Sequence, residues 1–367
     1  MKFSTPKEKL LNAVLVAERI VGKKESLPVL SCILLDAAES LSVRATNLEA
    51  GIDVQVPCTI EEKGTVAVAA NILSQTLRSI SGDKVVVSTE DGNLVIESKG
   101  SKTLIKALPH DEFPTLATES ASKGVTLPRE RIVRCIQNVS YAASPSMIRP
   151  ELGSVYISVR GNEVVCVATD SFRLAERTVQ SEGGYDKDGL DILVPLKHAV
   201  ELVHVLEHSK EELVEFSVSE SQLVVVAGTV RFVSRVVDGN FPNYKEVIPK
   251  TFVTEATMLK NDLAETLRKA RVFSGADQHI GLHVYPQKKI CTAMAQSANV
   301  GEMSDSIDAA LTGEDLDVNF HIGYLGDCLS SIESDSVTLY FAGVGRPLVI
   351  KGVSDTTFTY LVMPLNR

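Results

Sequence analysis

The sequence predicts an α+β fold in which three similar domains follow one another, each with two helices against an antiparallel sheet. Three amphipathic segments of equal length begin at positions 68, 194 and 320, so one pattern returns every 126 residues. A further helical segment and several short β-rich runs accompany each of them. Because repetition at so long a period indicates repeated domains, we expect tandem domains of roughly 120 residues.

The repeated segments are the expected second helix of each domain. They read VAANILSQTLRSI at 68–80, VPLKHAVELVHVL at 194–206 and FHIGYLGDCLSSI at 320–332. Apolar residues recur in them at the spacing of a helix that buries one face.

The first helix of each domain is expected at 5–24, 128–144 and 257–273. At the first of these, Thr5 precedes a proline and Glu8 follows three residues after the threonine. This pattern is typical of a capped helix start.

Short runs rich in β-branched residues predict the strands, and glycine-containing pairs predict the turns between them. Strands are expected at, among others, 28–35, 94–97, 164–167 and 223–226. Turns are expected at Asp91-Gly92 and Gly161-Asn162. The three domains are expected at 1–122, 123–251 and 252–367, with linkers at 115–124 and 243–257.

Composition agrees with several folded domains. The chain has 367 residues, of which 44% are hydrophobic, and this is enough for a core in each domain. No run approaches 18 apolar residues, and the N-terminus MKFSTPKEK leads into a charged helix, so we expect a cytoplasmic protein without a membrane partner. The six cysteines are scattered without a C-x-x-C pair, which favours reduced core thiols.

Charge is separated between the helices and the rest of the chain. The three first helices carry +3, +2 and +2 and the three second helices +1, 0 and −1, a net of +7, so the total of −10 leaves −17 elsewhere. A basic helical layer on an acidic body suits a polyanion that passes one surface. For any single helix, an ordinary solvated face remains the alternative.

Helix dimensions indicate how many chains would surround DNA. Helices packed side by side lie about 9.5 Å apart, so six would close a ring only about 18 Å across between axes. Twelve helices from two chains give about 36 Å between axes and about 26 Å of free bore, which admits B-DNA of about 20 Å. The smallest ring that fits is therefore a dimer.

Patterns for catalysis or metal binding are weak. His204 and His208 have a metal-compatible spacing on a helix, but no third ligand or H-E-x-x-H pattern accompanies them. The segment Asp186–Gly189 begins like a calcium loop but has a lysine at its twelfth position. Asp170 and Arg173 suit an ion pair that fixes a turn better than an acid/base site. We predict no catalytic residue, metal or cofactor; a DNA-modifying or hydrolytic enzyme with a basic channel is the alternative.

Six groups of motifs resemble one family. They are LPVL at 27–30, ATNLE at 45–49, LP at 108–109 with DEFP at 111–114, ATD at 168–170 with RLA at 173–175, VDGNFPNY at 237–244 and YLVMPL at 360–365. In this order and spacing, from Met1 to Arg367, they resemble the bacterial DNA polymerase III beta subunits, the replicative sliding clamps.

This resemblance implies a DNA clamp fold and a head-to-tail, ring-forming homodimer that encircles duplex DNA without reading its sequence. It implies a non-catalytic processivity factor in DNA replication, loaded by an ATP-driven clamp loader complex. Its partners would be the DNA polymerase III catalytic subunit and other polymerases or repair proteins that carry Q-L-x-L-F-type motifs.

The resemblance also implies three groups of site residues. The client-peptide pocket would be formed by Arg149, Leu152, Thr169, Arg173, Leu174, Pro242, Val247, His321, Tyr324, Arg346, Val362, Met363, Pro364 and Leu365. DNA would contact Lys23, Lys24, Arg78, Arg134, Lys197, Lys260 and Arg268, some of which could instead cap helix ends. The dimer interface would include Lys102, Ile105, Val272 and Phe273.

Two departures from the family pattern concern the pocket. Ser171-Phe172 stands where the family often has a glycine and a polar residue, which predicts a changed corner. Glu246 replaces a residue that is frequently basic, so acidic clients are expected to bind less well. If Val362–Leu365 is only a final core strand, no pocket is present there.

Overall fold

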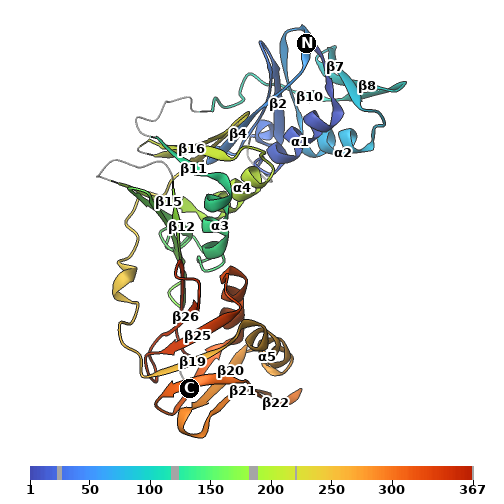
Figure 1. Cartoon of the computed structure of the whole chain (residues 1–367). Helices are drawn as coiled ribbons and strands as arrows, with labels where there is room; N and C mark the ends of the chain where they lie inside the picture. Colours follow the sequence, from blue (N-terminus) through green and yellow to red (C-terminus); the bar gives the residue numbers. More distant parts are fainter. Residues whose placement is uncertain (23–26, 117–123, 182–188, 220, 366–367) are drawn as a thin grey trace. The chain divides into compact units, whose positions relative to one another are not determined.

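The computed structural model describes residues 1–22, 27–116, 124–181, 189–219 and 221–365. A motif of strand, helix and three strands recurs six times, and two consecutive copies form what we call a module (Figure 1). The three modules confirm the predicted tandem of similar α+β domains, whereas the boundaries 1–122, 123–251 and 252–367 stay a prediction.

The elements follow the same order in every module. The first comprises β1 (Lys2–Pro6), α1 (Lys7–Glu18), β2 (Cys32–Ala37), β3 (Leu41–Thr46), β4 (Ala50–Val56), β6 (Gly64–Ala69), α2 (Ala70–Ser79), β7 (Lys84–Glu90), β8 (Asn93–Ser98) and β9 (Ser101–Ile105). The second comprises β11 (Gly124–Pro128), α3 (Arg129–Ser140), β12 (Ser154–Arg160), β13 (Glu163–Thr169), β14 (Arg173–Gln180), β15 (Leu190–Pro195), α4 (Leu196–Glu207), β16 (Leu213–Val218), β17 (Gln222–Ala227) and β18 (Val230–Arg235).

The third module repeats this order. It comprises β19 (Thr254–Leu259), α5 (Lys260–Phe273), β20 (His279–Tyr285), β21 (Ile290–Ser297), β22 (Gly301–Ser306), β24 (Leu316–His321), α6 (Ile322–Asp327), β25 (Ser336–Phe341), β26 (Leu348–Gly352) and β27 (Phe358–Val362). Short additions are β5 (Thr59–Glu62), β10 (Ala107–Leu108) and β23 (Ala309–Gly313), with 3-10 turns η1 (Pro28–Ser31), η2 (Tyr244–Glu246), η3 (Pro286–Lys288) and η4 (Cys328–Ser331).

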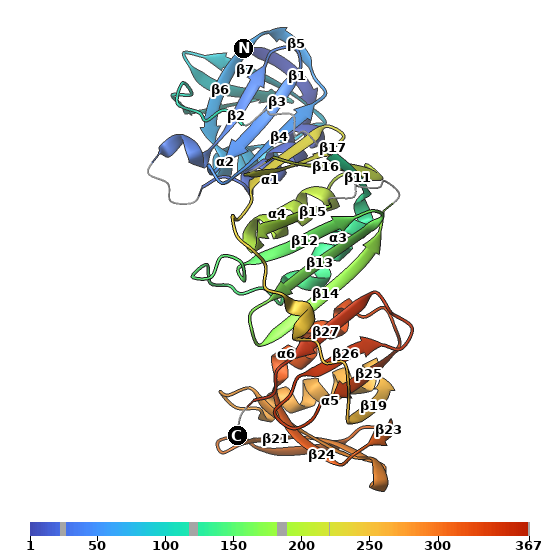
Figure 2. The ribbon, with the colours of Figure 1, turned by 90° about the vertical axis from the view of Figure 1, so that its left-hand side faces the viewer.

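Two of the sheets continue from one module into the next. Their strand orders are β10-β6-β2-β3-β4-β18-β17-β16-β11 and β15-β12-β13-β14-β27-β26-β25-β19-β23. The chain therefore divides into two compact units, one made of 1–130 and 200–236 and the other of 131–199 and 237–367. Within the second unit, Figure 2 shows β14 beside β27, the antiparallel pair that joins two modules.

The remaining sheets end at unpaired strands. Their orders are β5-β1-β7-β8-β9 in the first unit and β22-β21-β20-β24 in the second. Where modules join, the pairs are β4 with β18 and β14 with β27, and each of these strands is the last of its five-element motif. By the same rule β9 and β22, also last strands, are the two edges left over.

The same hydrogen bonds connect the two helices of each module. The first residue of α1, α3 and α5 donates its backbone N–H, at 2.8 Å, to the carbonyls of Asp83, Glu212 and Asp335 respectively. The side chains of the same three residues donate to carbonyls at the end of the second helix: Lys7 to Ile80 (2.9 Å), Arg129 to Leu206 (3.3 Å) and Lys260 to Ile332 (2.7 Å). This repeated bond satisfies carbonyls that a helix end leaves without partners.

Local predictions failed at two places near the N-terminus. The predicted cap is wrong, because Thr5 lies in β1, where its hydroxyl donates to the carbonyl of Pro57 at 2.8 Å, and α1 begins only at Lys7. The predicted strand 28–35 is half wrong, because η1 occupies Pro28–Ser31 and β2 starts at Cys32. Proline lacks the N–H that a strand ladder needs, which favours the turn.

A buried arginine fixes the junction of β14 and β27. The Arg177 side chain is 4% exposed, and its guanidinium donates to Asp355 at 2.8 Å as well as to Glu333. Burial by itself would raise the pKa of Asp355, but hydrogen bonds from Thr357 and from the backbone N–H groups of Glu333 and Thr357, with the charge of Arg177, hold that pKa below its usual value. The Asp355 carboxylate is therefore charged at neutral pH.

We predict that Arg177→Ala lowers the free energy of unfolding by about 3–5 kcal/mol, because it leaves the buried carboxylate of Asp355 without its cation. Urea unfolding followed by circular dichroism measures this. Arg160→Ala is the matched control, since Arg160 forms an exposed pair with Asp191 at 2.7 Å and its removal costs at most about 1 kcal/mol. Equal losses in the two variants would contradict the structural role of Arg177.

Candidate functional site

The turn that leads into β14 forms one side of the candidate site. The hydroxyl of Thr169 donates to the carbonyl of Arg173 at 2.6 Å, and Asp170 Oδ1 accepts from the N–H groups of Phe172 (2.9 Å) and Arg173 (3.0 Å). Ser171 has φ +79°, a left-handed conformation that is unfavourable for a residue other than glycine. These bonds hold the turn in one shape and fix the direction of Arg173.

Arg173 is the most connected side chain of the site. Its guanidinium pairs with Asp170 at 3.0 Å and with Asp327, and it is stacked 4.4 Å from the ring centre of Tyr324. The side chain is only 13% exposed. Because burial makes such pairs costly to break, the arginine is held over the tyrosine ring.

Tyr324 and His321 continue the site on the start of α6. Their rings lie 4.3 Å apart, and the carbonyl of Tyr324 accepts the buried hydroxyl of Tyr360 at 2.8 Å. Burial and the positive charge of Arg173 lower the pKa of His321. The imidazole is therefore neutral at neutral pH and takes up a proton only at lower pH than an ordinary histidine.

The C-terminal segment supplies the apolar wall. Met363 packs on the core cluster that contains Leu174, and its backbone N–H donates to the carbonyl of Phe172 at 2.8 Å. The N–H of Leu365 donates to the backbone carbonyl of Asn319 at 2.8 Å. The chain beyond β27 is therefore held by two backbone hydrogen bonds. Met363, Pro364 and Leu365 stay half-buried, which leaves apolar area for a ligand.

The structure brings together the centre of the predicted pocket. Strand pairing places Thr169 opposite Leu174 and Arg173 opposite Val362. The interpretation of Val362–Leu365 as only a final strand is wrong, because β27 ends at Val362 and the next residues form the half-buried wall.

The other predicted pocket residues have fewer contacts with the centre of the site. Pro242 and Val247 are exposed and flank Tyr244, which packs in the same cluster as Leu174. Leu152 is 5% exposed and donates its N–H to the carbonyl of Arg149, whose guanidinium pairs with Glu151 at 3.1 Å. Arg346 is exposed on the turn between β25 and β26.

Three exposed apolar side chains near these turns were not among the predicted site residues. They are Phe172 (61% exposed), Met147 (51%) and Ile148 (91%). The signal was present in the sequence as large apolar residues inside polar turns. Phe172 belongs to the departure from the family pattern, and its backbone carbonyl accepts the N–H of Met363.

The predicted DNA-contact residues differ in whether their charged groups already have a partner within the chain. Arg78, Lys197 and Arg268 are exposed. Arg134 pairs with Glu333 at 3.1 Å, and Lys260 donates to the carbonyl of Ile332 as part of the helix contact described above. Lys23 and Lys24 lie outside the described residues.

The predicted dimer residues lie on the two leftover edges or next to them. Ile105 is 4% exposed, whereas its neighbour Leu104 on β9 is 49% exposed. Lys102 pairs with Glu90 at 2.6 Å within its own chain. Val272 is 63% exposed, and the Phe273 ring lies 3.9 Å from the position a Cβ would take at Gly301 of β22.

Within the described ranges, no group of three or more His, Cys, Asp or Glu residues could hold a metal ion. His208 Nδ1 lies 2.7 Å from the carbonyl of His204, in the same helix turn. The motif at 186–189 falls, except for its glycine, outside the described residues. None of the described helices is both long and apolar enough to span a bilayer.

We predict that Arg173→Gln raises the pKa of His321 toward the ordinary histidine value, because burial remains but the cation is removed. An NMR titration of the imidazole protons, assigned with His321→Gln, measures this. Arg149→Gln is the control and leaves the pKa of His321 unchanged. An unchanged pKa in Arg173→Gln would contradict the described geometry.

Three family models together match nearly the whole chain. They are the N-terminal, central and C-terminal domains of the DNA polymerase III beta subunit, at residues 1–117, 126–243 and 245–366. A curated relative, the Beta sliding clamp of Bacillus subtilis, is 26% identical over 379 residues that cover 100% of each chain.

Solved structures share the fold. The crystal structure of the DNA polymerase sliding clamp from Bacillus subtilis has 25% identity and a TM-score of 0.94, covering 100% of this chain and 99% of that one. The DNA polymerase III beta subunit from Thermotoga maritima has 24% identity and a TM-score of 0.94, with the same coverage.

Proposed function

This chain belongs to the family of DNA polymerase III beta subunits, the sliding clamps, and we propose that two copies of it close head to tail into a ring around duplex DNA. It is a processivity factor and not an enzyme. The observation that carries the ring is that β9 and β22, each at one edge of its own sheet, are left without a partner strand in the described part of the chain.

The pairing rule inside the chain supports the closure. Last strands pair antiparallel twice, β4 with β18 and β14 with β27, and within the described ranges β9 and β22 are the last strands without such a partner. Exposed edges invite pairing with another chain. If β9 of one copy meets β22 of the other, two copies satisfy both edges and the assembly closes.

Side chains beside these edges suit a seam. Leu104 projects from β9, and Val272 and Phe273 lie beside β22 on the end of α5. We therefore assign to Leu104 the contact first expected of Ile105, which is buried in its own sheet. Glu302 on β22 is negatively charged and Lys102 on β9 is positively charged, so the two could form an ion pair across the seam.

The helices suit the inside of the ring. The exposed side chains of Arg78, Lys197 and Arg268 would contact DNA phosphates. Arg134 already forms an ion pair with Glu333, and Lys260 donates to the carbonyl of Ile332. A small number of free cations fits a sliding protein, because many phosphate contacts would make binding tight and salt-dependent. Lys23 and Lys24 stay predictions.

The site beside β14 and β27 is proposed to take client peptides. Met363, Pro364 and Leu365 offer a pliable apolar wall for the leucine and phenylalanine of a Q-L-x-L-F-type motif. The stacked guanidinium of Arg173 and the neutral imidazole of His321 supply donors that orient the glutamine. The clients would be the DNA polymerase III catalytic subunit, other polymerases, repair proteins and an ATP-driven clamp loader, all in the cytoplasm.

We predict that Met363→Ala weakens binding of a Q-L-x-L-F peptide about tenfold, the loss expected when a central apolar contact is truncated. Fluorescence anisotropy of the labelled peptide against the full chain measures this. Met294→Ala is the matched control, since Met294 is 44% exposed on β21. Equal affinity in all three proteins would contradict the proposed site.

We predict that Leu104→Asp converts the dimer to a monomer at concentrations where the unchanged chain is dimeric, because it places a carboxylate in an apolar seam. Mass photometry measures the two species. Leu213→Asp, at a leucine that is 53% exposed on β16, is the control and leaves the dimer intact. A variant Leu104→Asp that stays dimeric would place the seam elsewhere.

A further inference from the structure

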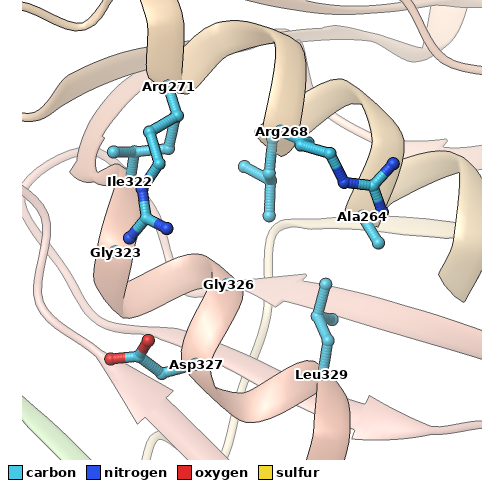
Figure 3. A pocket seen from close by; sticks show the side chains of 9 residues that line it. Ala264, Arg268, Arg271, Ile322, Gly323, Gly326, Asp327 and Leu329 are labelled. Carbon is cyan, nitrogen blue, oxygen red and sulfur yellow. The ribbon is translucent and has the colours of Figure 1, made fainter.

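A hollow between two helices adjoins the candidate peptide site. It has a volume of about 280 Å³ and lies between α5 and α6 in the second unit (Figure 3). Arg268 and Arg271 of α5 line it together with Asp327 of α6. Asp327 also belongs to the peptide site, because it pairs with Arg173. The hollow and the peptide site therefore share this carboxylate.

The two arginines of the hollow point in different directions. Figure 3 shows the guanidinium of Arg271 directed toward Gly323 of α6, whereas that of Arg268 is directed toward Ala264 of its own helix. An Arg271 nitrogen lies 3.8 Å from the position that a Cβ would take at Gly323. Atoms Cε1 and Nδ1 of the His321 ring lie 3.0 and 3.2 Å from the same position. Of the two arginines, Arg271 is thus the neighbour of the imidazole in the peptide site.

Arg271 is a cation without a partner beside cations and anions that have one. Its side chain is exposed and has no carboxylate partner in the described part of the chain. Arg173, in contrast, pairs with both Asp170 and Asp327. Burial and the charge of Arg173 lower the pKa of His321, and the charge of Arg271 lowers it further. An anion that enters here therefore meets one unpaired guanidinium, while the two aspartates are already bonded to the other.

Gly323 leaves the space between His321 and Arg271 open. A Cβ at this position would approach the imidazole to 3.0 Å, which is closer than ordinary van der Waals contact. In the proposed pose, His321 orients the glutamine of the motif, and the wall at Met363 takes the leucine and phenylalanine that follow. The residues before the glutamine are then the ones nearest to Gly323 and Arg271. One or two residues of extended chain, at about 3.4 Å each, span the interval.

We propose that Arg271 binds an acidic residue placed one or two positions before the glutamine of a client motif. A guanidinium suits this role because it can donate two parallel N–H bonds to a carboxylate. The expectation that Glu246 disfavours acidic clients concerns η2, where Asn243 donates to the Glu246 carboxylate at 2.6 Å, and not the elements around Arg271. The inference rests on the proposed peptide site and adds to it a preference among clients.

The test measures the preference for an acidic residue with and without Arg271. Two N-acetylated peptides carry a fluorophore at the C-terminus, one with glutamate two positions before the glutamine of Q-L-x-L-F and one with alanine in its place. In anisotropy titrations at about 50 mM salt, we expect the unchanged chain to bind the acidic peptide about threefold more tightly, the gain typical of an exposed ion pair. Arg271→Gln should bind both peptides with the affinity that the unchanged chain has for the neutral one.

Lys269→Gln is the matched control. It removes one cation from the same helix, at a side chain that pairs with Asp305 at 2.9 Å, and should keep the preference of about threefold. Arg271→Lys keeps the charge but loses the two parallel bonds, so it should keep part of the preference. A third peptide, with glutamate after the phenylalanine, should gain nothing from Arg271.

Four results would overturn the inference. They are equal affinity of the unchanged chain for the acidic and neutral peptides, a preference that Arg271→Gln retains, a preference that Lys269→Gln loses to the same extent, and an equal gain from Arg271 when the glutamate follows the phenylalanine. The third would indicate a general effect of charge, and the fourth another place for Arg271 along the peptide. If the unchanged chain binds none of the peptides, the proposed peptide site itself fails.

Discussion

Pairing between last strands is the constraint on which the rest of the structure depends. β4 pairs with β18 and β14 with β27, so each of the two long sheets belongs to two modules. The second junction also carries the buried pair of Arg177 and Asp355 and positions Arg173 beside Val362. The candidate peptide site therefore depends on a sheet that two modules share. The same rule leaves β9 and β22 without a partner among the described residues, and an exposed edge strand can pair with another chain.

The repeat made the tandem of similar domains predictable from the sequence. The sharing of one sheet by two modules was not predictable. Helical periodicity indicated the position of each of the six α-helices in the described residues, closely for 194–206 against Leu196–Glu207 but not for 5–24, where α1 already ends at Glu18. The sequence could not show that sheets cross the expected boundaries, because strand pairing is a long-range property. At 320–332 the helix is interrupted, since α6 ends at Asp327 and a 3-10 turn follows, a change in hydrogen bonding that side-chain periodicity does not record.

The site was predictable where motifs fix the backbone and not where exposure depends on strand register. The turn from Thr169 to Arg173 and the segment after Val362 lie together as the family resemblance implied. The expectation for Ile105 depends on which face of β9 is buried, and a shift of one residue exchanges it with Leu104. Only the fold shows whether an arginine forms an ion pair. Arg134 pairs with the carboxylate of Glu333, 199 residues away in sequence, whereas Arg271 has no carboxylate partner in the described residues.

The central claim is that the chain holds DNA by topology and not by affinity. The most direct test loads the chain onto nicked circular DNA with a clamp loader complex and ATP, washes at high salt and then linearises the DNA. The account predicts that the protein stays on the circle at salt concentrations that remove electrostatically bound proteins and leaves once free ends are made. Loss from circular and linear DNA at the same salt concentration, or retention after linearisation, would contradict it.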